Sequence, residues 1–470
     1  MIALNYRLLI YPYSFMTGNQ NPTPTGNTLT TADPMSRQTN YRWVIVALLF
    51  FATTINYLDR QVISLLKPIL EKEFNWSETD YGNIVTVFTF FYGTSTLLAG
   101  YIIDRVGTKL GYIGAIVVWS FAAMGHALAG GTAGFMVARA LLGIGEAGNF
   151  PASIKTVAEW FPQKERALAV GIFNAGANIG AVAAPALVPI IAVTWGWQMA
   201  FIITGALGFL WIAAWWYYYE VPARHTRVSP SELAYITEAP TVDPMTAGNA
   251  ASTNLVDDAP ARKYAIFGNR AIWGFMSGKF MTDPIWWFFL FWLPTYLSNI
   301  YNLDLKTLGA PLIVIYSAAT IGSVGGGWLS SMLIRKGWHP TRARQWSMAL
   351  FAICVMPVML ISQVDGLWPV IGILSLAVAA HQAWSANIFT VAADQFPKTV
   401  LSRVVGLGTM AGTLGGAIFP LIVGRILDHY KLLGNLSEGY YIIFYIAGLA
   451  YLVAWTMLYI FVFSRAAKNK

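Results

Sequence analysis

Six ionisable side chains lie within long apolar segments of the chain, where an isolated charge is costly. Each ionised group near the centre of a bilayer costs roughly 2.5–3.5 kcal/mol on insertion scales. Such groups must be paired, hydrated or used to bind a charged ligand. A static ion-pair network is the alternative interpretation, because the six formal charges sum to zero. The six residues are Asp59, Arg60, Arg139, Glu146, Lys279 and Asp283.

Spacing places three residues of one apolar segment on a single helical face. Arg139, Gly143 and Glu146 stand at i, i+4 and i+7, and the glycine allows a second helix to approach closely. Asp59 and Arg60 are adjacent and point about 100° apart, so one faces this helix while the other faces a cavity.

These positions suggest a coupling chemistry. We hypothesise that Arg60 binds a carboxylate of the ligand and that ionised Glu146 competes with the ligand for Arg60. Protonation of Glu146 then releases Arg60 to the anion. Asp59 is expected to pair with Arg139 and to act as a second titrating site, since burial and neighbouring arginines shift carboxyl pKa values in opposite directions.

The second half of the chain offers further polar groups at similar depth. Lys279 either binds an anion or pairs with Asp283 at i+4. His381 either binds sugar hydroxyls and titrates near neutrality or is a packing histidine. Trp384 and Asn387, at i and i+3, share its face. An indole suits the apolar face of a pyranose, and an amide suits its hydroxyls.

Asn174 and Asn178, at i and i+4, provide the same amide chemistry on another apolar segment. No nucleophile triad or metal-ligand cluster accompanies these groups, because the five histidines are scattered along the chain. The sequence therefore predicts a protein that is not an enzyme and needs no cofactor or metal.

The elements that position these residues are membrane-spanning helices. The chain has 470 residues, of which 56% are apolar and only 11% are charged, against about 25% charged in a soluble domain. Twelve apolar stretches approach or exceed the roughly 20 residues that a span needs. We predict an all-α integral membrane protein with spans at 43–66, 79–103, 110–130, 134–157, 167–190, 198–220, 271–299, 309–334, 346–363, 367–393, 403–425 and 440–463.

Loop charges predict the orientation. With a cytoplasmic N-terminus, cytoplasmic segments hold 22 Lys and Arg residues and external segments hold five, so both termini are expected inside. Residues 1–42 are predicted to be a disordered tail, with Met35 as a possible start, and 465–470 a cytoplasmic tail. Residues 222–270 form a cytoplasmic linker, in which Ser229, Pro230 and Glu232 predict the start of a short helix.

The two halves of the chain repeat. Ala158, Glu159, Phe161 and Pro162 recur as Ala393, Asp394, Phe396 and Pro397, 235 positions later without a gap. This predicts two pseudo-symmetric six-helix bundles, 43–221 and 271–464. Parallel halves with a site between them are typical of secondary transporters that work by alternating access. No phosphate-binding loop is present, which argues against ATP-driven pumping.

Several motifs resemble a known family. The loop from Gly100 to Lys109 resembles the signature loop of the major facilitator superfamily. Three stretches resemble its anion:cation symporter family, and two are most similar to bacterial hexuronate transporters. The three are 56–60, 139–147 and 159–162, and the two are 279–294 and 384–387.

The resemblance implies a major facilitator fold in a bacterial inner membrane and a proton-coupled symporter that imports a sugar acid. The expected substrate is a hexuronate (glucuronate or galacturonate); the alternatives are an aldonate such as galactonate and, less favoured, a drug/proton antiporter. The partners are then the organic anion, H⁺ and lipid, with no nucleic acid and a monomeric state. Arg60 and Glu146 match the family's functional positions, and Tyr92 resembles a substrate-facing position.

The signature loop has a different expected role. A carboxylate at the inner end of the second span pairs with basic residues or a helix N-terminus and holds the bundles together. Asp104, with Arg105 and Lys109, is therefore predicted to belong to a cytoplasmic gate. Glu159 and Asp394 are expected to complete inner clusters with Arg166 and Arg403.

Overall fold

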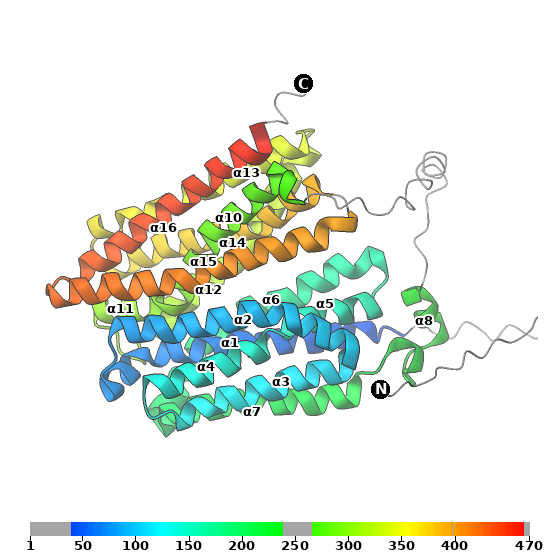
Figure 1. Cartoon of the computed structure of the whole chain (residues 1–470), viewed down its shortest axis with the longest axis horizontal. Coiled ribbons are helices and arrows are strands. Elements are labelled where there is room, and N and C mark those ends of the chain that lie inside the picture. Colours follow the sequence, from blue (N-terminus) through cyan, green and yellow to red (C-terminus); the bar gives the residue numbers. More distant parts are fainter. Residues whose placement is uncertain (1–38, 238–265, 397, 465–470) are drawn as a thin grey trace, which may run out of the picture.

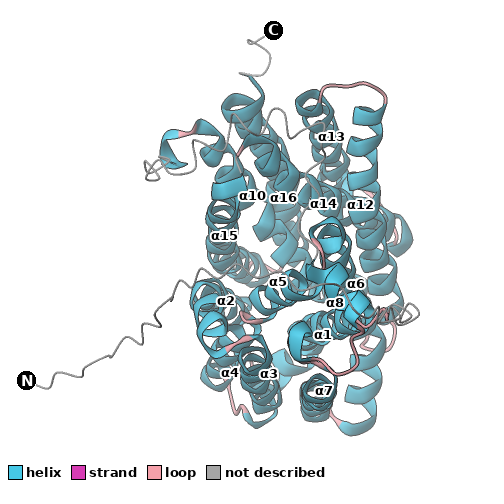
Figure 2. Cartoon of the chain, turned by 90° about the vertical axis from the view of Figure 1, so that its right-hand side faces the viewer, coloured by secondary structure: helices cyan, strands magenta, loops and turns pink. Residues whose placement is uncertain are grey.

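The computed structural model describes residues 39–237, 266–396 and 398–464, and every regular element in these ranges is helical (Figures 1 and 2). The predicted disorder of 1–38, the middle of the linker and the tail 465–470 lie outside the described residues. The first half contains α1 (Arg42–Phe74), α2 (Glu78–Val106), α3 (Thr108–Gly125), α4 (Thr132–Glu146), α5 (Asn149–Trp160), α6 (Gln163–Trp195) and α7 (Trp197–Tyr218).

The linker helix α8 (Pro230–Thr237) separates the halves. The second half contains α10 (Arg270–Phe291), α11 (Leu293–Tyr301), α12 (Gly309–Arg335), α13 (Pro340–Val355), α14 (Leu367–Gln395), α15 (Lys398–Leu432) and α16 (Leu436–Leu458). Short helical turns continue several of them, notably η4 (Met356–Gln363) after α13 and the π-helical turn η5 (Tyr459–Phe463) after α16.

The helices correspond in position to the twelve predicted spans. Within the described ranges, nine helices are long and apolar enough to cross a membrane, and α2, which bends by 46° between Thr96 and Leu98, makes a tenth. The predicted spans 134–157 and 271–299 are each divided into two helices, α4–α5 and α10–α11. Two of the predicted spans are therefore each built from two consecutive helices.

Prolines account for both breaks. Pro151 stands three residues into α5 and Pro294 two residues into α11, and a proline has no N–H for the carbonyl four residues earlier. The carbonyls of Ala147 and Leu290 therefore lose their helical partners, and the chain turns near them. The first break directly follows Glu146, so the carboxylate lies at a helix end.

The helices form two bundles, α1–α7 and α10–α16, and Figure 2 views their ends with the two groups separate. The bundles lie close together at the end where α1 meets α2, here called the α1–α2 end, and diverge toward the α2–α3 end (Figure 1). At the α1–α2 end, Asp428 of α15 accepts hydrogen bonds from the N–H groups of Glu78 and Thr79, both at 2.8 Å. The Tyr81 hydroxyl donates to the Phe291 carbonyl at 2.9 Å.

Glycines allow this contact between the bundles. A Cβ on Gly82 would lie 2.7 Å from the Pro420 carbonyl oxygen, and one on Gly424 would lie 2.7 Å from that of Glu78. Real Cβ atoms do not approach backbone this closely, so α2 and α15 pack against each other only because both residues are glycines. The interface between the bundles is therefore tightest at the α1–α2 end.

At the opposite end, α8 is fixed to the first bundle. Ser229 caps α8 as predicted, accepting from the Glu232 N–H at 3.1 Å. The Glu232 carboxylate, however, is buried and binds α1: it accepts from the N–H groups of Tyr41 and Arg42 at 3.0 and 3.1 Å. Residues 39–42, predicted to belong to the disordered tail, are thus held by α8.

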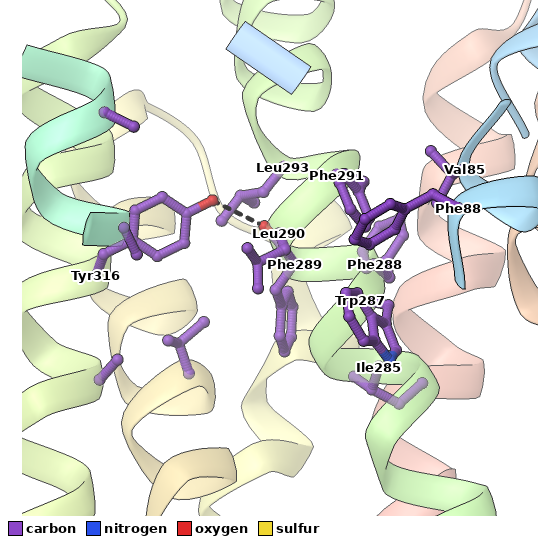
Figure 3. Packing of buried hydrophobic residues seen from close by; sticks show 14 of the residues in the cluster. Val85, Phe88, Ile285, Trp287, Phe288, Phe289, Leu290, Phe291, Leu293 and Tyr316 are labelled. Atoms are coloured by element: carbon purple, nitrogen blue, oxygen red, sulfur yellow. Dashed lines mark hydrogen bonds between the residues drawn. The ribbon is translucent and has the colours of Figure 1, made fainter. Parts of the chain in front are cut away.

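The interior of each bundle is apolar, and the outward surface carries large exposed apolar side chains such as Ile321 and Leu210. Figure 3 shows the packing around α10, where Trp287 faces Phe88 of α2 and the Tyr316 hydroxyl donates to the Phe289 carbonyl at 3.0 Å. An outer surface of this kind fits a lipid environment. The core around α10 thus joins the two bundles at the depth of the buried charges.

Candidate functional site

A buried ion pair lies where the bundles meet. Glu146 Oε2 accepts from Arg60 Nη2 at 2.6 Å and from Arg60 Nε at 3.0 Å, and both residues are almost completely buried. Arg60 Nη2 also donates to Asn56 Oδ1 at 3.3 Å. The predicted proximity of Arg60 and Glu146 is therefore present, in a geometry in which one carboxylate oxygen binds two guanidinium nitrogens.

Four aromatic rings surround the guanidinium. The centroids of Tyr57, Tyr92, Phe88 and Trp287 lie 4.7, 4.8, 5.2 and 5.2 Å from Arg60 Cζ. They come from α1, α2 and α10, so both bundles enclose the same cation. Ring faces attract a cation and displace water from it, and the site therefore combines a strong positive centre with a low local dielectric.

Small residues bring the helices of the site together. A Cβ on Gly143 would lie 2.7 Å from the Phe88 carbonyl oxygen, so α2 and its rings reach α4 only because this residue is glycine. On α6, Gly176 and Gly180 similarly contact the α1 backbone at Phe50 and Thr54. The helix approach expected at Gly143 is confirmed. The contacts of α6 with α1 were missed, although glycines four residues apart are a recognised signal.

The predicted pair of Asp59 with Arg139 does not form. Arg139 Nη1 and Nη2 instead donate to the Arg60 carbonyl at 3.5 and 3.4 Å. Neither Asp59 carboxylate oxygen has a hydrogen-bond partner among the described residues, although the side chain is buried. Arg139 therefore supports the backbone that carries Arg60, and its long side chain satisfies a carbonyl where an ion pair was expected.

The second bundle carries its own ion pair. Lys279 Nζ lies 2.7 Å from Asp283 Oδ2 on the same helix, with 6% and 19% of the two side chains exposed. Of the two interpretations of Lys279, pairing with Asp283 is thus present. Lys279 Nζ also lies 4.5 Å from the centroid of the Phe389 ring.

His381 lies near this pair, stacked on Trp286 with a centroid distance of 5.1 Å and an angle of 3°. Its Nδ1 is hydrogen-bonded to the Tyr451 hydroxyl. Nε2 has no hydrogen bond to other described residues. His381 is therefore packed against Trp286 and hydrogen-bonded through one ring nitrogen, which fits the packing interpretation, and its sugar-binding role stays a prediction.

Two predicted sugar-binding residues are used in packing instead. Trp384 is completely buried against Tyr451. The Asn387 amide donates to the carbonyls of Gly326 and Ala383, both at 2.9 Å, and accepts from Arg344 at 3.4 Å. The shared helical face was read correctly, but in this conformation it faces α12 and α16, because small residues on α12 allow close packing there.

The other predicted binding residues differ in position. Tyr92 is half-buried and belongs to the rings around Arg60. Asn178 is half-buried on α6, two residues from Gly176 and Gly180, and hence turned about 200° away from the face that contacts α1. The packing of α6 on α1 therefore does not bring Asn178 to Arg60.

The predicted gate residues pair within the first bundle. Asp104 binds Lys155 Nζ at 2.8 Å, and Lys109 binds Glu220 at 3.0 Å. The hydrogen bond from Lys109 lowers the pKa of the Glu220 carboxyl below its ordinary value. Arg105 lies over the ring of Tyr101, 4.4 Å from its centroid.

The inner clusters differ from expectation as well. Glu159 accepts from Thr108 at 2.7 Å and from Tyr219 at 2.5 Å, whereas Arg166 donates to the carbonyls of Phe161 and Ala158. The expected Glu159–Arg166 pair is thus replaced, because Arg166 caps the end of α5. Asp394 binds Arg344 at 3.3 Å, and the side chain of Arg403 lies outside the described part.

Sequence reasoning missed an ion network at the α1–α2 end. Lys67, counted as an external loop residue, is completely buried and lies 2.8 Å from Glu78 and 3.1 Å from Glu71. Glu71 also pairs with Lys431 of α15. The network links both bundles. The only signal for it in the sequence is a lysine followed by two acidic residues in one short stretch.

The arrangement suits anion binding and proton exchange more than covalent chemistry. Two cations, Arg60 and Lys279, each have a carboxylate partner whose protonation would free the cation. In the part of the chain that the structure describes, no group of three or more His, Cys, Asp and Glu residues is placed to hold a metal ion. Two helical bundles with a buried ion pair where they meet define the class of protein as a secondary transporter.

Comparison with known proteins identifies the family. Residues 49–420 match the Major Facilitator Superfamily, and the chain belongs to it. The hexuronate transporter of Escherichia coli (strain K12) is 33% identical over 388 residues, covering 82% of this chain and 88% of that protein. The galacturonate transporter of Dickeya chrysanthemi is 34% identical over 295 residues, covering 63% and 83%.

A solved structure shares the fold. The D-xylose–proton symporter aligns with a TM-score of 0.69 at 18% identity, covering 90% of this chain and 98% of that one. This protein is therefore a multi-pass membrane transporter and not an enzyme, as the sequence predicted.

Proposed function

We propose that this protein is a proton-coupled symporter that imports a sugar acid, with a hexuronate such as glucuronate or galacturonate as its substrate. The observation that carries the proposal is the Arg60–Glu146 pair, buried between the bundles with Glu146 Oε2 at 2.6 and 3.0 Å from two guanidinium nitrogens. In this pair, Glu146 is the acid that competes with a substrate carboxylate for the Arg60 guanidinium.

Competition for Arg60 provides the coupling. While Glu146 is ionised it occupies the guanidinium, and a substrate carboxylate must displace it in a site with little water. Once Glu146 is protonated, the guanidinium is left to the substrate, whose negative charge then replaces that of Glu146. Proton and anion therefore bind together. Asp59, which is buried in the same segment of α1 and has no hydrogen-bond partner among the described residues, is proposed as the second proton-binding carboxylate.

The substrate assignment rests on chemistry and relatives. Arg60 provides a site for one carboxylate, and Tyr92, Lys279 and His381 add polar groups that suit a hydroxylated acid. Arg139 contributes by supporting the carbonyl of Arg60. The two curated relatives described above carry the names of hexuronate and galacturonate transporters, which supports a hexuronate over galactonate.

Orientation follows from the loop charges. The excess of Lys and Arg in alternate loops supports a cytoplasmic location of both termini, and the proposed membrane is the inner membrane of a bacterium. The α1–α2 end then faces outward, and this conformation is closed to the outside by the contacts of Asp428 with α2. Asp104, Arg105 and Lys109 are proposed to exchange their present partners for the second bundle when the inner end closes.

Uptake into proteoliposomes tests the proposal. The purified protein, proposed to be a monomer, is reconstituted, and accumulation of labelled glucuronate and galacturonate is followed under an imposed inward proton gradient, with galactonate as comparison. A one-unit pH gradient is expected to drive about tenfold accumulation for one proton and one monovalent anion. Collapse of the gradient with an uncoupler provides the control.

The outcomes separate mechanism from substrate. Hexuronate accumulation above that of galactonate supports both parts of the proposal. Accumulation of galactonate alone supports proton coupling but shows that the substrate is an aldonate and not a hexuronate. No driven uptake of any of the three acids, by protein that remains folded and inserted, contradicts the proposal and returns Arg60 and Glu146 to a structural role.

A further inference from the structure

The second ion pair occupies the face of α10 that is turned toward Arg60. Lys279, Asp283 and Trp287 stand at i, i+4 and i+8 of α10, and residues so spaced share one face. The Trp287 ring lies 5.2 Å from Arg60 Cζ. These three residues therefore form a row that begins beside Arg60 and runs along α10. Asp283 lies about 6 Å and Lys279 about 12 Å from Trp287 along the helix axis.

Asp283 is also close to the first bundle. Trp287, four residues further along α10, contacts Phe88 of α2 and lies over Arg60 of α1, so this part of α10 packs against the first bundle. The side chain of Asp283 is 19% exposed, whereas that of Glu146 is completely buried. Asp283 thus combines proximity to the Arg60 site with an accessible carboxylate.

The position of this carboxylate is fixed by its surroundings. A Cβ on Gly412 of α15 would overlap Asp283 Oδ2, so the absence of a side chain at Gly412 provides the space that the carboxylate fills. Lys279 holds the same oxygen at 2.7 Å from the preceding turn. Because both partners belong to one helix, their contact does not depend on how the bundles are arranged.

We infer that Asp283 is a specificity-determining residue that selects sugar acids with a single carboxylate over those with a carboxylate at both ends. The inference rests on the proposed function. A substrate whose carboxylate binds Arg60 extends along α10 toward Asp283. A hydroxyl at its far end donates to the Asp283 carboxylate, whereas a second carboxylate meets a like charge and finds Lys279 already paired. Discrimination comes from this repulsion as much as from the hydrogen bond.

The predicted effect of Asp283→Asn follows directly. The amide removes the negative charge and leaves Lys279 free to bind a second carboxylate. Relative to glucuronate, the affinity for glucarate, the same sugar acid oxidised at the other end, is expected to rise about tenfold. A double variant, Asp283→Asn with Lys279→Gln, is expected to lose most of that gain because the free cation is gone.

Binding is measured in detergent by the fluorescence change on titration with glucuronate and with glucarate, since Trp286 and Trp287 lie beside the site. Competition of each acid against labelled glucuronate uptake gives a second readout. Asp283→Glu, which keeps the charge, is the matched control and is expected to keep the preference for glucuronate. Gly412→Ala, which displaces the carboxylate without changing a charge, is expected to shift the ratio in the same direction by a smaller factor.

The inference and the proposed function fail in different ways. If the unaltered protein neither binds nor transports glucuronate, the proposed function is wrong and the selection inferred from it is overturned with it. If the unaltered protein prefers glucuronate but Asp283→Asn and Gly412→Ala leave the ratio of the two affinities unchanged, only the role of Asp283 is overturned. If Asp283→Asn raises the affinity for glucarate relative to glucuronate and the double variant with Lys279→Gln keeps that increase, the role of Asp283 is also contradicted. The freed lysine would then not be the group that binds the second carboxylate.

Discussion

The two buried ion pairs of this transporter are built differently. Arg60 and Glu146 belong to separate helices, α1 and α4, and Glu146 is completely buried at a helix end. Lys279 and Asp283 belong to one helix, four residues apart, and Asp283 retains 19% of its side-chain exposure. Both pairs place a cation beside a carboxylate, but only the first depends on the packing of two helices.

This difference suggests a division of labour. A pair formed between helices can open and close as the helices shift, so its state can be coupled to the conformational cycle. A pair within one helix keeps its geometry in every conformation, so it is suited to a constant task such as reading the shape and charge of the ligand. The first pair is thus expected to govern coupling and the second to govern selectivity.

Removal of the two cations should produce the largest difference. Loss of one partner from a buried pair costs about 3–5 kcal/mol, and Arg60 is also the proposed carboxylate site. Arg60→Gln is expected to reduce both driven uptake and substrate exchange more than about a hundredfold. Lys279→Gln should raise KM for glucuronate by a smaller factor.

Arg335→Gln, at an exposed position of α12, is the control for the loss of a basic residue and should leave uptake unchanged. Initial rates in proteoliposomes, normalised to inserted protein, provide the measurement. Equal losses for Arg60→Gln and Lys279→Gln would show that the two pairs share one role.

Removal of the carboxylates tests the same division from the other side. Glu146→Gln should abolish proton-driven accumulation, about tenfold for a one-unit pH gradient, while exchange of labelled for unlabelled substrate continues. The reason is that the amide no longer takes up a proton but still leaves Arg60 to the anion. Asp283→Asn should leave the proton-driven accumulation of substrate unchanged.

Accumulation and exchange are measured on the same vesicles, with Glu438→Gln at an exposed position as the control. Loss of binding together with coupling in Glu146→Gln would contradict the competition mechanism. Loss of accumulation in Asp283→Asn would place part of the coupling in the second bundle.

The first pair joins two helices, and it could be predicted because buried charges need partners and because Arg60 and Glu146 match functional positions of the family that the sequence resembles. Charged residues in apolar segments must find partners, and the spacing of Arg139, Gly143 and Glu146 defines one helical face. The positions of the helices could be predicted because hydropathy is a property of each stretch. The two helix breaks carried a signal in Pro151 and Pro294 that continuous apolarity concealed.

The remaining features depend on contacts between distant segments. The rings around Arg60 come from three helices, and the burial of Lys67 depends on acids from α1 and α2 and on packing against the second bundle. Adjacent residues on a helix point in different directions, so the partner of Asp59 could not be fixed by spacing alone. Arg139 reached a backbone carbonyl instead, an outcome that residue types do not distinguish from an ion pair.

The contact that closes the α1–α2 end should affect the two pairs unequally. Asp428→Asn weakens charge-assisted hydrogen bonds to the first turn of α2, each worth about 1.5–3 kcal/mol, of which the amide retains a part. Opening at this end is expected to become about fivefold more populated. The environment of Arg60, enclosed by both bundles, should change, and the Lys279–Asp283 pair should not.

Labelling measures this opening. With Cys354 replaced by Ser and Thr86, whose hydroxyl contacts the Ala417 carbonyl, replaced by Cys, an impermeant maleimide reports access from the α1–α2 end. Asp365→Asn, an exposed acid elsewhere on the second bundle, is the control. An unchanged labelling rate in Asp428→Asn would mean that the other contacts hold this end closed.

The smallest expected effect concerns the ring that joins the two sites. Trp287 lies over Arg60 on one side and one turn from Asp283 on the other. Trp287→Leu removes one of the four rings around Arg60 but keeps an apolar side chain there, so KM for glucuronate should rise about threefold with coupling intact. Trp328→Leu, at an exposed position of α12, should have no effect. The ratio of glucuronate to glucarate affinity distinguishes the alternatives. An unchanged ratio means that Trp287 acts only on the first pair. A ratio that moves toward that of Asp283→Asn would mean that the ring also positions the far end of the substrate. Coupling and selectivity would then be less clearly divided between the two pairs than their separate construction implies.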